Sequence, residues 1–108
     1  MPFVNTQPDT FSTVSPTSLF GGASPTSGYL PANNGRSLIY AQSVGNAVPF
    51  YLSLNGFPAS TANFNIALKG ASADLGGDGG VWSSEAFKGP VFYSGAANAK
   101  LVLWENKD

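Results

Sequence analysis

Residues 63–69, NFNIALK, show the cleanest alternation of apolar and polar side chains in this 108-residue chain. In an extended strand Phe64, Ile66 and Leu68 fall on one face, and the residues between them fall on the other. A period of two residues is the mark of a strand that is buried on one side. This stretch therefore predicts a β-strand whose Phe64, Ile66 and Leu68 face a core.

Further strands are predicted on both sides of this one. Upstream, the apolar-rich residues 37–44 and 48–54 meet at Gly45-Asn46, a glycine-first pair suited to a type II′ turn, and are expected to form a hairpin. Downstream, strands are predicted over residues 81–83, 90–94 and 100–105. The last of these has apolar side chains on both faces, which indicates a central or interface strand. Residues 36–108 are thus expected to form one compact all-β domain, a small β-sandwich or barrel.

The first 35 residues have a different composition. They carry a single charged side chain, Asp9, hold five of the eight prolines and follow no regular hydrophobic period. Disordered tails combine low hydrophobicity with high charge, and this stretch has no such charge. We interpret residues 1–35 as an extended Pro/Ser/Thr-rich docking arm. The apolar side chains expected to contact its partner are Phe3, Val4, Phe11, Val14, Leu19, Phe20, Tyr29 and Leu30.

The arm could dock on the chain's own domain or on another molecule. Ordering 35 residues costs more backbone entropy than eight apolar side chains return on burial. Strand pairing or additional partner surface must supply the rest, and extended segments commonly obtain both at the sheet edge of a neighbour. Docking on another protein is therefore the favoured interpretation, with docking on the same chain as the alternative.

Charge is sparse, with five Lys plus Arg and six Asp plus Glu, so that only 10% of the residues are charged. Soluble domains usually carry about 25%. Low charge favours association, so we expect a subunit of an assembly and a homo-oligomer. The basic residues are spread singly, which argues against nucleic-acid binding. No apolar run approaches the ~18 residues of a membrane span, so no membrane partner is expected.

The residue types needed for common catalytic chemistry are missing or badly placed. The chain has no His, which is the commonest general base, and no Cys. The carboxylates of Asp74, Asp78 and Glu85 lie in or beside the glycine-rich residues 75–80, a poor platform for a catalytic pair. The same loop lacks the spacing of known calcium motifs, and glycine clusters more often mark mobile or tightly turned connections. We expect no enzymatic activity, no metal site and no cofactor.

Aromatic side chains offer an alternative function. Eight Phe, four Tyr and two Trp make up 13% of the residues. Exposed rings of Trp82, Tyr93 and Trp104 would suit a carbohydrate-binding module, because sugar rings stack on open aromatic faces. In a small domain such rings more often fill the core or a subunit interface, and this is the favoured interpretation.

The chain as a whole resembles the capsid decoration (cement) proteins of tailed bacteriophages and other small virion structural proteins. The likeness lies in a short, Cys-free, Gly/Ala/Ser/Thr-rich chain with an uncharged, Pro-containing arm before a β domain that ends near residues 104–107. It spans the whole chain and carries over no functional residue. The resemblance implies a virion protein, assembled in the host cytoplasm, that docks on a scaffold such as a major capsid protein, with a trimer as the favoured oligomer. A tail, neck or fibre component fits the same features almost as well.

Overall fold

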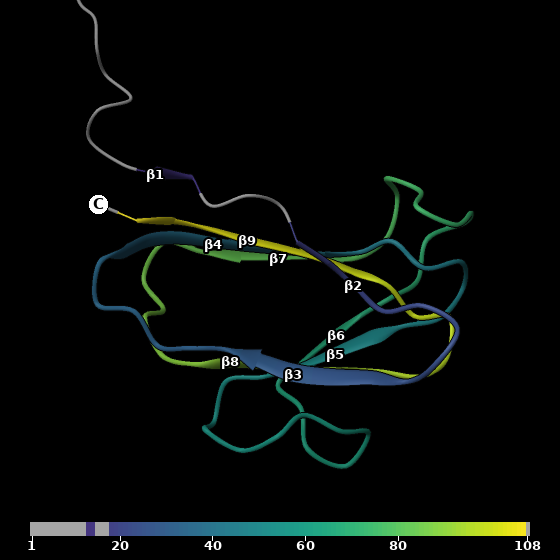
Figure 1. Cartoon of the computed structure of the whole chain (residues 1–108), viewed down its shortest axis with the longest axis horizontal. Helices are drawn as coiled ribbons and strands as arrows, with labels where there is room; N and C mark the ends of the chain where they lie inside the picture. Colours follow the sequence, from purple (N-terminus) through teal and green to yellow (C-terminus); the bar gives the residue numbers. More distant parts are fainter. Residues whose placement is uncertain (1–12, 15–17, 108) are drawn as a thin grey trace, which may run out of the picture.

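The computed structural model describes residues 13–14 and 18–107, which form nine β-strands and no helix. The strands lie in two antiparallel sheets stacked face to face, as Figure 1 shows. Their bounds are β1 (Thr13–Val14), β2 (Ser18–Phe20), β3 (Thr26–Leu30), β4 (Arg36–Ser43), β5 (Phe50–Ser53), β6 (Ile66–Leu68), β7 (Val81–Ser84), β8 (Val91–Gly95) and β9 (Leu101–Lys107). The expected all-β class is confirmed, in the form of a sandwich. Within the described ranges no helix is long and apolar enough to cross a membrane.

The strand order is that of a jelly roll. In the sheet that we call the β9 sheet, β1 and β2 both pair with β9, and β4 and β7 follow. In the other, the β8 sheet, the order is β3-β8-β5-β6. With β1 set aside, the orders 2-9-4-7 and 3-8-5-6 are those of an eight-stranded double-sheet jelly roll, which consists of two Greek keys.

All six strands predicted from the sequence are present as β4 to β9, but the predicted hairpin is wrong. β4 and β5 do not pair with each other, because they belong to different sheets. The connection between them crosses from one sheet to the other, and the amide of Ala47 donates to the carbonyl of Ala71 instead of closing a two-residue turn. Alternating side chains show that a strand has one buried face, but they do not show which strand lies beside it.

The position of Phe64 also differs from the prediction. β6 begins at Ile66, and Phe64 precedes it with 43% of its surface exposed. Its ring lies against Tyr51 at 4.9 Å between centroids, and Tyr51 points outward from β5. Ile66 and Leu68 do face the core, as the alternation predicts.

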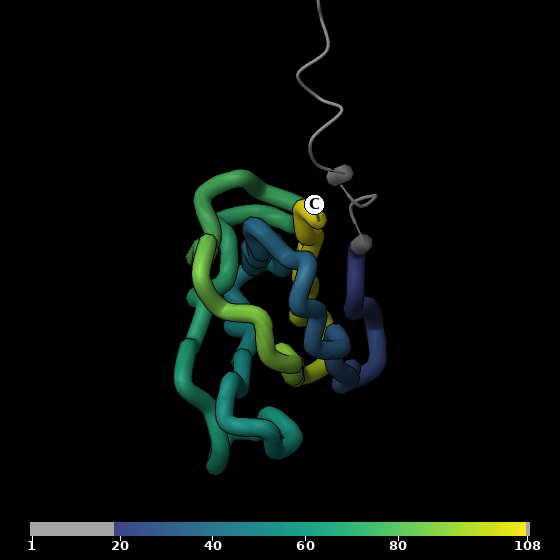
Figure 2. The backbone as a smooth tube through the Cα atoms, turned by 90° about the vertical axis from the view of Figure 1, so that its left-hand side faces the viewer, coloured from purple at the N-terminus to yellow at the C-terminus, as the bar shows by residue number. Residues whose placement is uncertain are grey.

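The sandwich includes residues that the sequence assigned to the arm. β2 pairs with β9, with Leu19 opposite Val102, and β3 pairs with β8, with Tyr29 opposite Phe92. Figure 2 shows β2, in purple, running beside the yellow C-terminal strand β9. The compact domain therefore starts well before residue 36.

The core fills the space between the sheets with aliphatic and aromatic side chains from both. Phe50, Leu52 and Leu101 are completely buried. Tyr93 lies between two Phe rings, at 4.7 Å from Phe20 and 6.1 Å from Phe50 between centroids. β9 lies between β2 and β4, which confirms the prediction of a central strand from its two apolar faces.

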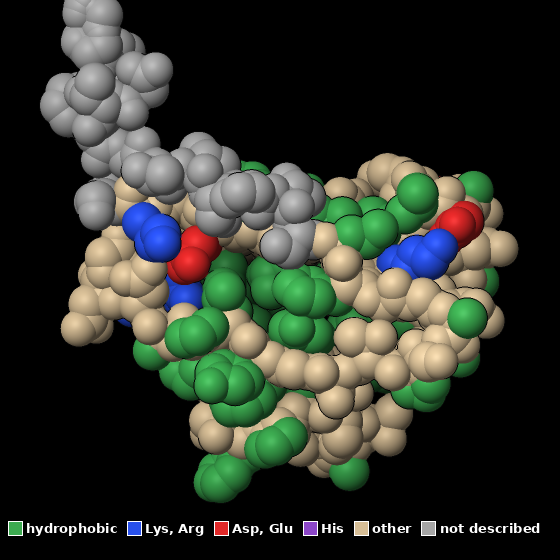
Figure 3. Space-filling view, viewed as in Figure 1, with side chains coloured by type: hydrophobic (Ala, Val, Ile, Leu, Met, Phe, Trp, Pro, Cys, Tyr) green, Lys and Arg blue, Asp and Glu red, His purple; other side chains and the backbone are tan. Residues whose placement is uncertain are grey.

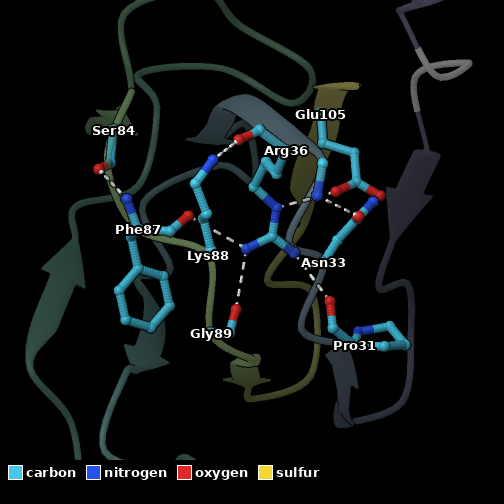
Figure 4. Close-up of polar contacts among 9 residues, drawn as sticks. Pro31, Asn33, Arg36, Ser84, Phe87, Lys88, Gly89 and Glu105 are labelled. Carbon is cyan, nitrogen blue, oxygen red and sulfur yellow. Dashed lines mark hydrogen bonds and ion pairs between the residues drawn. The ribbon is translucent and has the colours of Figure 1, made fainter. Parts of the chain in front are cut away.

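One end of the sandwich is closed by the buried guanidinium of Arg36, shown in Figure 4. Its Nε donates to Oε1 of Glu105 at 2.8 Å, in an ion pair whose side chains are 1% and 12% exposed. The two terminal nitrogens donate to three backbone carbonyls, those of Pro31, Phe87 and Gly89. We call this arrangement the Arg36 clamp. It connects β9 to the loops that precede β4 and β8.

Candidate protein interface

The outward positions of both sheets carry no charged side chain within the described strands. The strand registers place two sets of side chains outward. On the β9 sheet, which we call the β9 face, these are Leu19, Leu38, Tyr40, Gln42, Val81, Ser83, Val102, Trp104 and Asn106. On the β8 sheet, the β8 face, they are Ser27, Tyr29, Tyr51, Ala67, Phe92 and Ser94. Ser53 has the same register but is completely buried. Antiparallel sheets that face water usually place polar and charged residues at such positions.

A stacked aromatic pair lies near the middle of the β9 face. The rings of Tyr40 and Trp104 are 5.1 Å apart between centroids and 18° from parallel. In the next row, Leu19 and Val81 are 52% and 50% exposed at the two edges of the sheet. Gln42 lies in this row and donates through Nε2 to the carbonyl of Gly77. The β9 face is thus apolar at both edges in this row and aromatic near its middle.

The β8 face carries a second aromatic pair and a groove. Tyr29 is 57% exposed and stacks on Phe92 at 5.2 Å between centroids. These rings line a groove of about 270 Å³ together with Pro58 and Ala59, from the loop between β5 and β6. The exposed Phe57 belongs to the same loop.

The charged groups that form ion pairs lie at opposite ends of the sandwich. The pair of Arg36 and Glu105 closes one end, and Lys100 pairs with Asp74 at the other. In the view of Figure 3, blue and red side chains appear at the two ends, and green hydrophobic side chains lie among tan ones in the middle and lower part. Tyr, Trp and Phe with few charges are typical of the cores of protein interfaces.

The side chains predicted to dock on a partner do not form one stripe. Leu19 and Tyr29 are exposed, but on opposite faces of the sandwich, whereas Phe20 and Leu30 pack against the chain's own core. The backbone of Val14 pairs with β9 opposite Asn106. Phe3, Val4 and Phe11 lie outside the described residues.

The three rings considered for carbohydrate stacking also lie on different surfaces. Tyr93 is only 8% exposed and Trp82 points into the sandwich, where it contacts Phe87 edge-on at 6.4 Å between centroids. Trp104 alone points outward, and its ring is stacked on Tyr40. No single face therefore presents these rings together.

The three carboxylates near the glycine-rich loop have separate roles. Asp74 pairs with Lys100, and Asp78 accepts hydrogen bonds from Ser72, which lower the pKa of its carboxyl. Glu85 lies in the exposed turn after β7. Among residues 13–14 and 18–107, no group of three or more Asp, Glu, His or Cys could hold a metal ion.

Burial raises the pKa of the Tyr93 phenol above its usual 10.0. Because the unfolded chain ionises this tyrosine more easily, the fold keeps its full stability below pH 10.0 and loses stability as the pH rises beyond it. We expect the thermal midpoint of the natural chain to fall more between about pH 9 and 11 than that of Tyr93→Phe. The exposed Tyr29→Phe is the matched control, and an identical alkaline loss in both variants would contradict the prediction.

No protein-family model, curated protein or solved structure matches this chain. What the chain does must therefore be inferred from its own topology and surfaces. The two uncharged aromatic faces are the feature that most needs a functional explanation.

Proposed function

We propose that this chain is a non-enzymatic structural subunit of a virion, which decorates a capsid and stabilises it. The observation that carries the proposal is the absence of charge on both outer faces of the described sandwich, where the pairs Tyr40–Trp104 and Tyr29–Phe92 are displayed. A free monomer gains solubility from charged faces. Faces without charge and with stacked aromatic rings are suited to being covered by protein.

The topology supports the same assignment by analogy at the level of the fold. Double-sheet jelly rolls form viral capsid proteins and are also found in lectins and cupins. A fold alone does not assign a function, so the surfaces have to carry the choice among these classes. Uncharged faces on a chain with only 10% charged residues favour an assembly subunit.

The N-terminal residues provide the attachment in this proposal. β1 and β2 occupy the edge of β9, so residues 1–12 continue from a point beside the C-terminal strand. Residues 1–12 have the sequence MPFVNTQPDTFS, which contains Phe3, Val4 and Phe11 and a single charged side chain. The sandwich then acts as the body of the subunit, and residues 1–12 bind the scaffold, a major capsid protein.

Co-sedimentation with empty capsids of the same virus tests this attachment. The full chain is expected to sediment with the capsids to saturation. A chain that lacks residues 1–12 retains all described strands and should bind at least about tenfold more weakly, a loss of roughly 1.4 kcal/mol. Replacing the same residues by a Gly/Ser linker of equal length is the matched control for length, and it should bind as weakly as the deletion.

Two outcomes separate the parts of the proposal. If the full chain does not sediment with capsids, the decorating role is wrong. If the deletion binds as well as the full chain, attachment through residues 1–12 is wrong. Light scattering of the purified chain without capsids should give the mass of a trimer of the 11.1 kDa chain. A monomer at high concentration would contradict the oligomer.

A further inference from the structure

Three loops meet at the end of the sandwich opposite the Arg36 clamp. They connect β4 to β5, β6 to β7 and β8 to β9, at the right-hand end in Figure 1. Between them lies a pocket of about 310 Å³ that is open to solvent, which we call the loop pocket. It is lined by Asn46, Val48, Asp74, Asn98 and Lys100.

The loop pocket is surrounded by strained backbone. Among the described residues, the non-glycine residues with a left-handed φ are Ala47, Leu75 and Asn98, at 60°, 58° and 72°. One of them lines the pocket, and the other two directly follow the lining residues Asn46 and Asp74. Such conformations persist only where the surroundings impose them, and they gather at ligand sites.

Backbone hydrogen bonds to other segments of the chain hold these conformations. The amide of Ala47 donates to Ala71, that of Leu75 donates to Val44, and that of Asn98 donates to Gly22, each to a backbone carbonyl at 2.7–2.8 Å. Every left-handed residue is thus fixed by a different segment of the chain. The backbone around the pocket is therefore tied to other segments of the fold, and a site that is formed in advance reduces the entropic cost of binding.

Close backbone contact holds the first and third loops together. A Cβ at Gly45 would lie 2.6 Å from the carbonyl oxygen of Asn98 and 2.7 Å from the amide nitrogen of Lys100. Only glycine allows this approach. The contact fixes the distance between the lining residues of the two loops.

The lining combines hydrogen-bonding groups with no net charge. Nζ of Lys100 lies 2.8 Å from both carboxylate oxygens of Asp74, so the two charges compensate each other. The carboxamides of Asn46 and Asn98 each add a donor and an acceptor. Val48 contributes an apolar surface.

We propose that the loop pocket binds a neutral polyhydroxylated ligand of the size of one sugar ring. Hydroxyl groups both donate and accept, and they match a lining of two carboxamides, a carboxylate and an ammonium. The ion pair of Asp74 and Lys100 leaves no net charge to attract an anion or a cation. A cavity of about 310 Å³ lies at the small end of the range of ligand sites, about 300–1,000 Å³. The proposal is independent of the capsid role, because it concerns neither outer face nor residues 1–12.

A titration followed in ¹H–¹⁵N correlation NMR spectra tests the site. The ligands are the methyl glycosides of glucose, galactose, mannose and N-acetylglucosamine. At least one of them should cause saturable shifts at the backbone amides of Asn46, Leu75, Asn98 and Lys100. Asn98→Gly removes a carboxamide and keeps the left-handed backbone accessible. We expect it to bind that glycoside about tenfold more weakly. Asn46→Ala should act in the same direction.

Asn34→Ala is the matched control, since Asn34 is an exposed asparagine at the other end of the sandwich. It should bind like the natural chain, and unchanged thermal midpoints show that the variants are folded. The proposal is overturned if none of the four glycosides causes saturable shifts at these amides, or if Asn98→Gly binds as well as Asn34→Ala. Stronger saturable binding of inorganic phosphate at the same amides would also overturn it, because the site would then select an anion.

Discussion

Replacing Arg36 by methionine is expected to lower the free energy of unfolding by about 3–5 kcal/mol, the usual cost of removing one partner from a buried ion pair. The guanidinium is 1% exposed and holds together segments that are far apart in the sequence. Without it, the carboxylate of Glu105 loses its ion pair with Arg36 in a position that is only 12% exposed. The carbonyls of Pro31 and Gly89 lose their donors as well.

Urea unfolding of a short series measures this effect. Arg36→Lys keeps the charge but offers one nitrogen in place of a planar fork, so it should recover only part of the loss. The double variant Arg36→Met, Glu105→Leu should be more stable than Arg36→Met alone, because the buried carboxylate is removed with its partner. A loss of less than about 1 kcal/mol in Arg36→Met, the range of exposed pairs, would contradict the clamp.

Replacing Gly79 by alanine should lower the free energy of unfolding by at least about 3 kcal/mol, the upper end of the usual cost of overpacking. A Cβ at this position would lie 1.8 Å from the carbonyl oxygen of Ser43 and 3.3 Å from that of Lys69. Both neighbours are backbone atoms, so no side chain can turn away to make room. Ser43 is the last residue of β4, so the glycine-rich loop must move away from the end of that strand.

Gly77 in the same loop is the matched control. A Cβ there has no atom within 4 Å, and its φ is not left-handed. Gly77→Ala should therefore be neutral or stabilising by about 0.4–1 kcal/mol through the unfolded state. Thermal and urea unfolding of the two variants, made side by side, give the comparison. Equal stability of Gly79→Ala and Gly77→Ala would contradict the close approach of Gly79 to the backbone of β4.

The substitutions of Gly79 and Arg36 should have different effects on glycoside binding at the loop pocket. Asp74 lies in the same loop as Gly79, so displacement of this loop should also move a lining side chain. The Arg36 clamp lies at the opposite end of β4. Substitution of Arg36 should therefore leave glycoside binding unchanged in any variant that remains folded. This contrast separates a general loss of stability from a local change at the pocket.

The sequence predicted the glycine-rich loop as a mobile or tightly turned connection. Four glycines around Asp78 argued against a catalytic or calcium-binding platform. The structure adds the reason for two of them, since Gly79 packs on Ser43 and Gly80 packs on the backbone of Leu68 and Lys69. Close approach of distant backbone is a tertiary contact, so no local pattern could reveal it.

The candidate surfaces were predictable only in part. Sequence reasoning placed Val102 and Trp104 on a second apolar face of a central or interface strand, and it favoured a core or subunit interface for the Trp104 ring, with an exposed ring as the alternative. It did not find the Tyr29–Phe92 pair, which joins a strand of the supposed arm to β8. It also missed Arg36 as a buried group, since the three carbonyl acceptors come from two separate loops.

By itself the sequence determined the all-β class, the positions of β4 to β9 and the central place of β9. Each of these follows from the period of two residues and from turn residues, which act within a few neighbours along the chain. Only the tertiary structure decided that β4 and β5 belong to different sheets and that β2 and β3 complete a jelly roll. It alone placed Ala47 and Leu75 in left-handed conformations around one pocket, because hydrogen bonds from distant segments, and no property of Ala or Leu, hold them there.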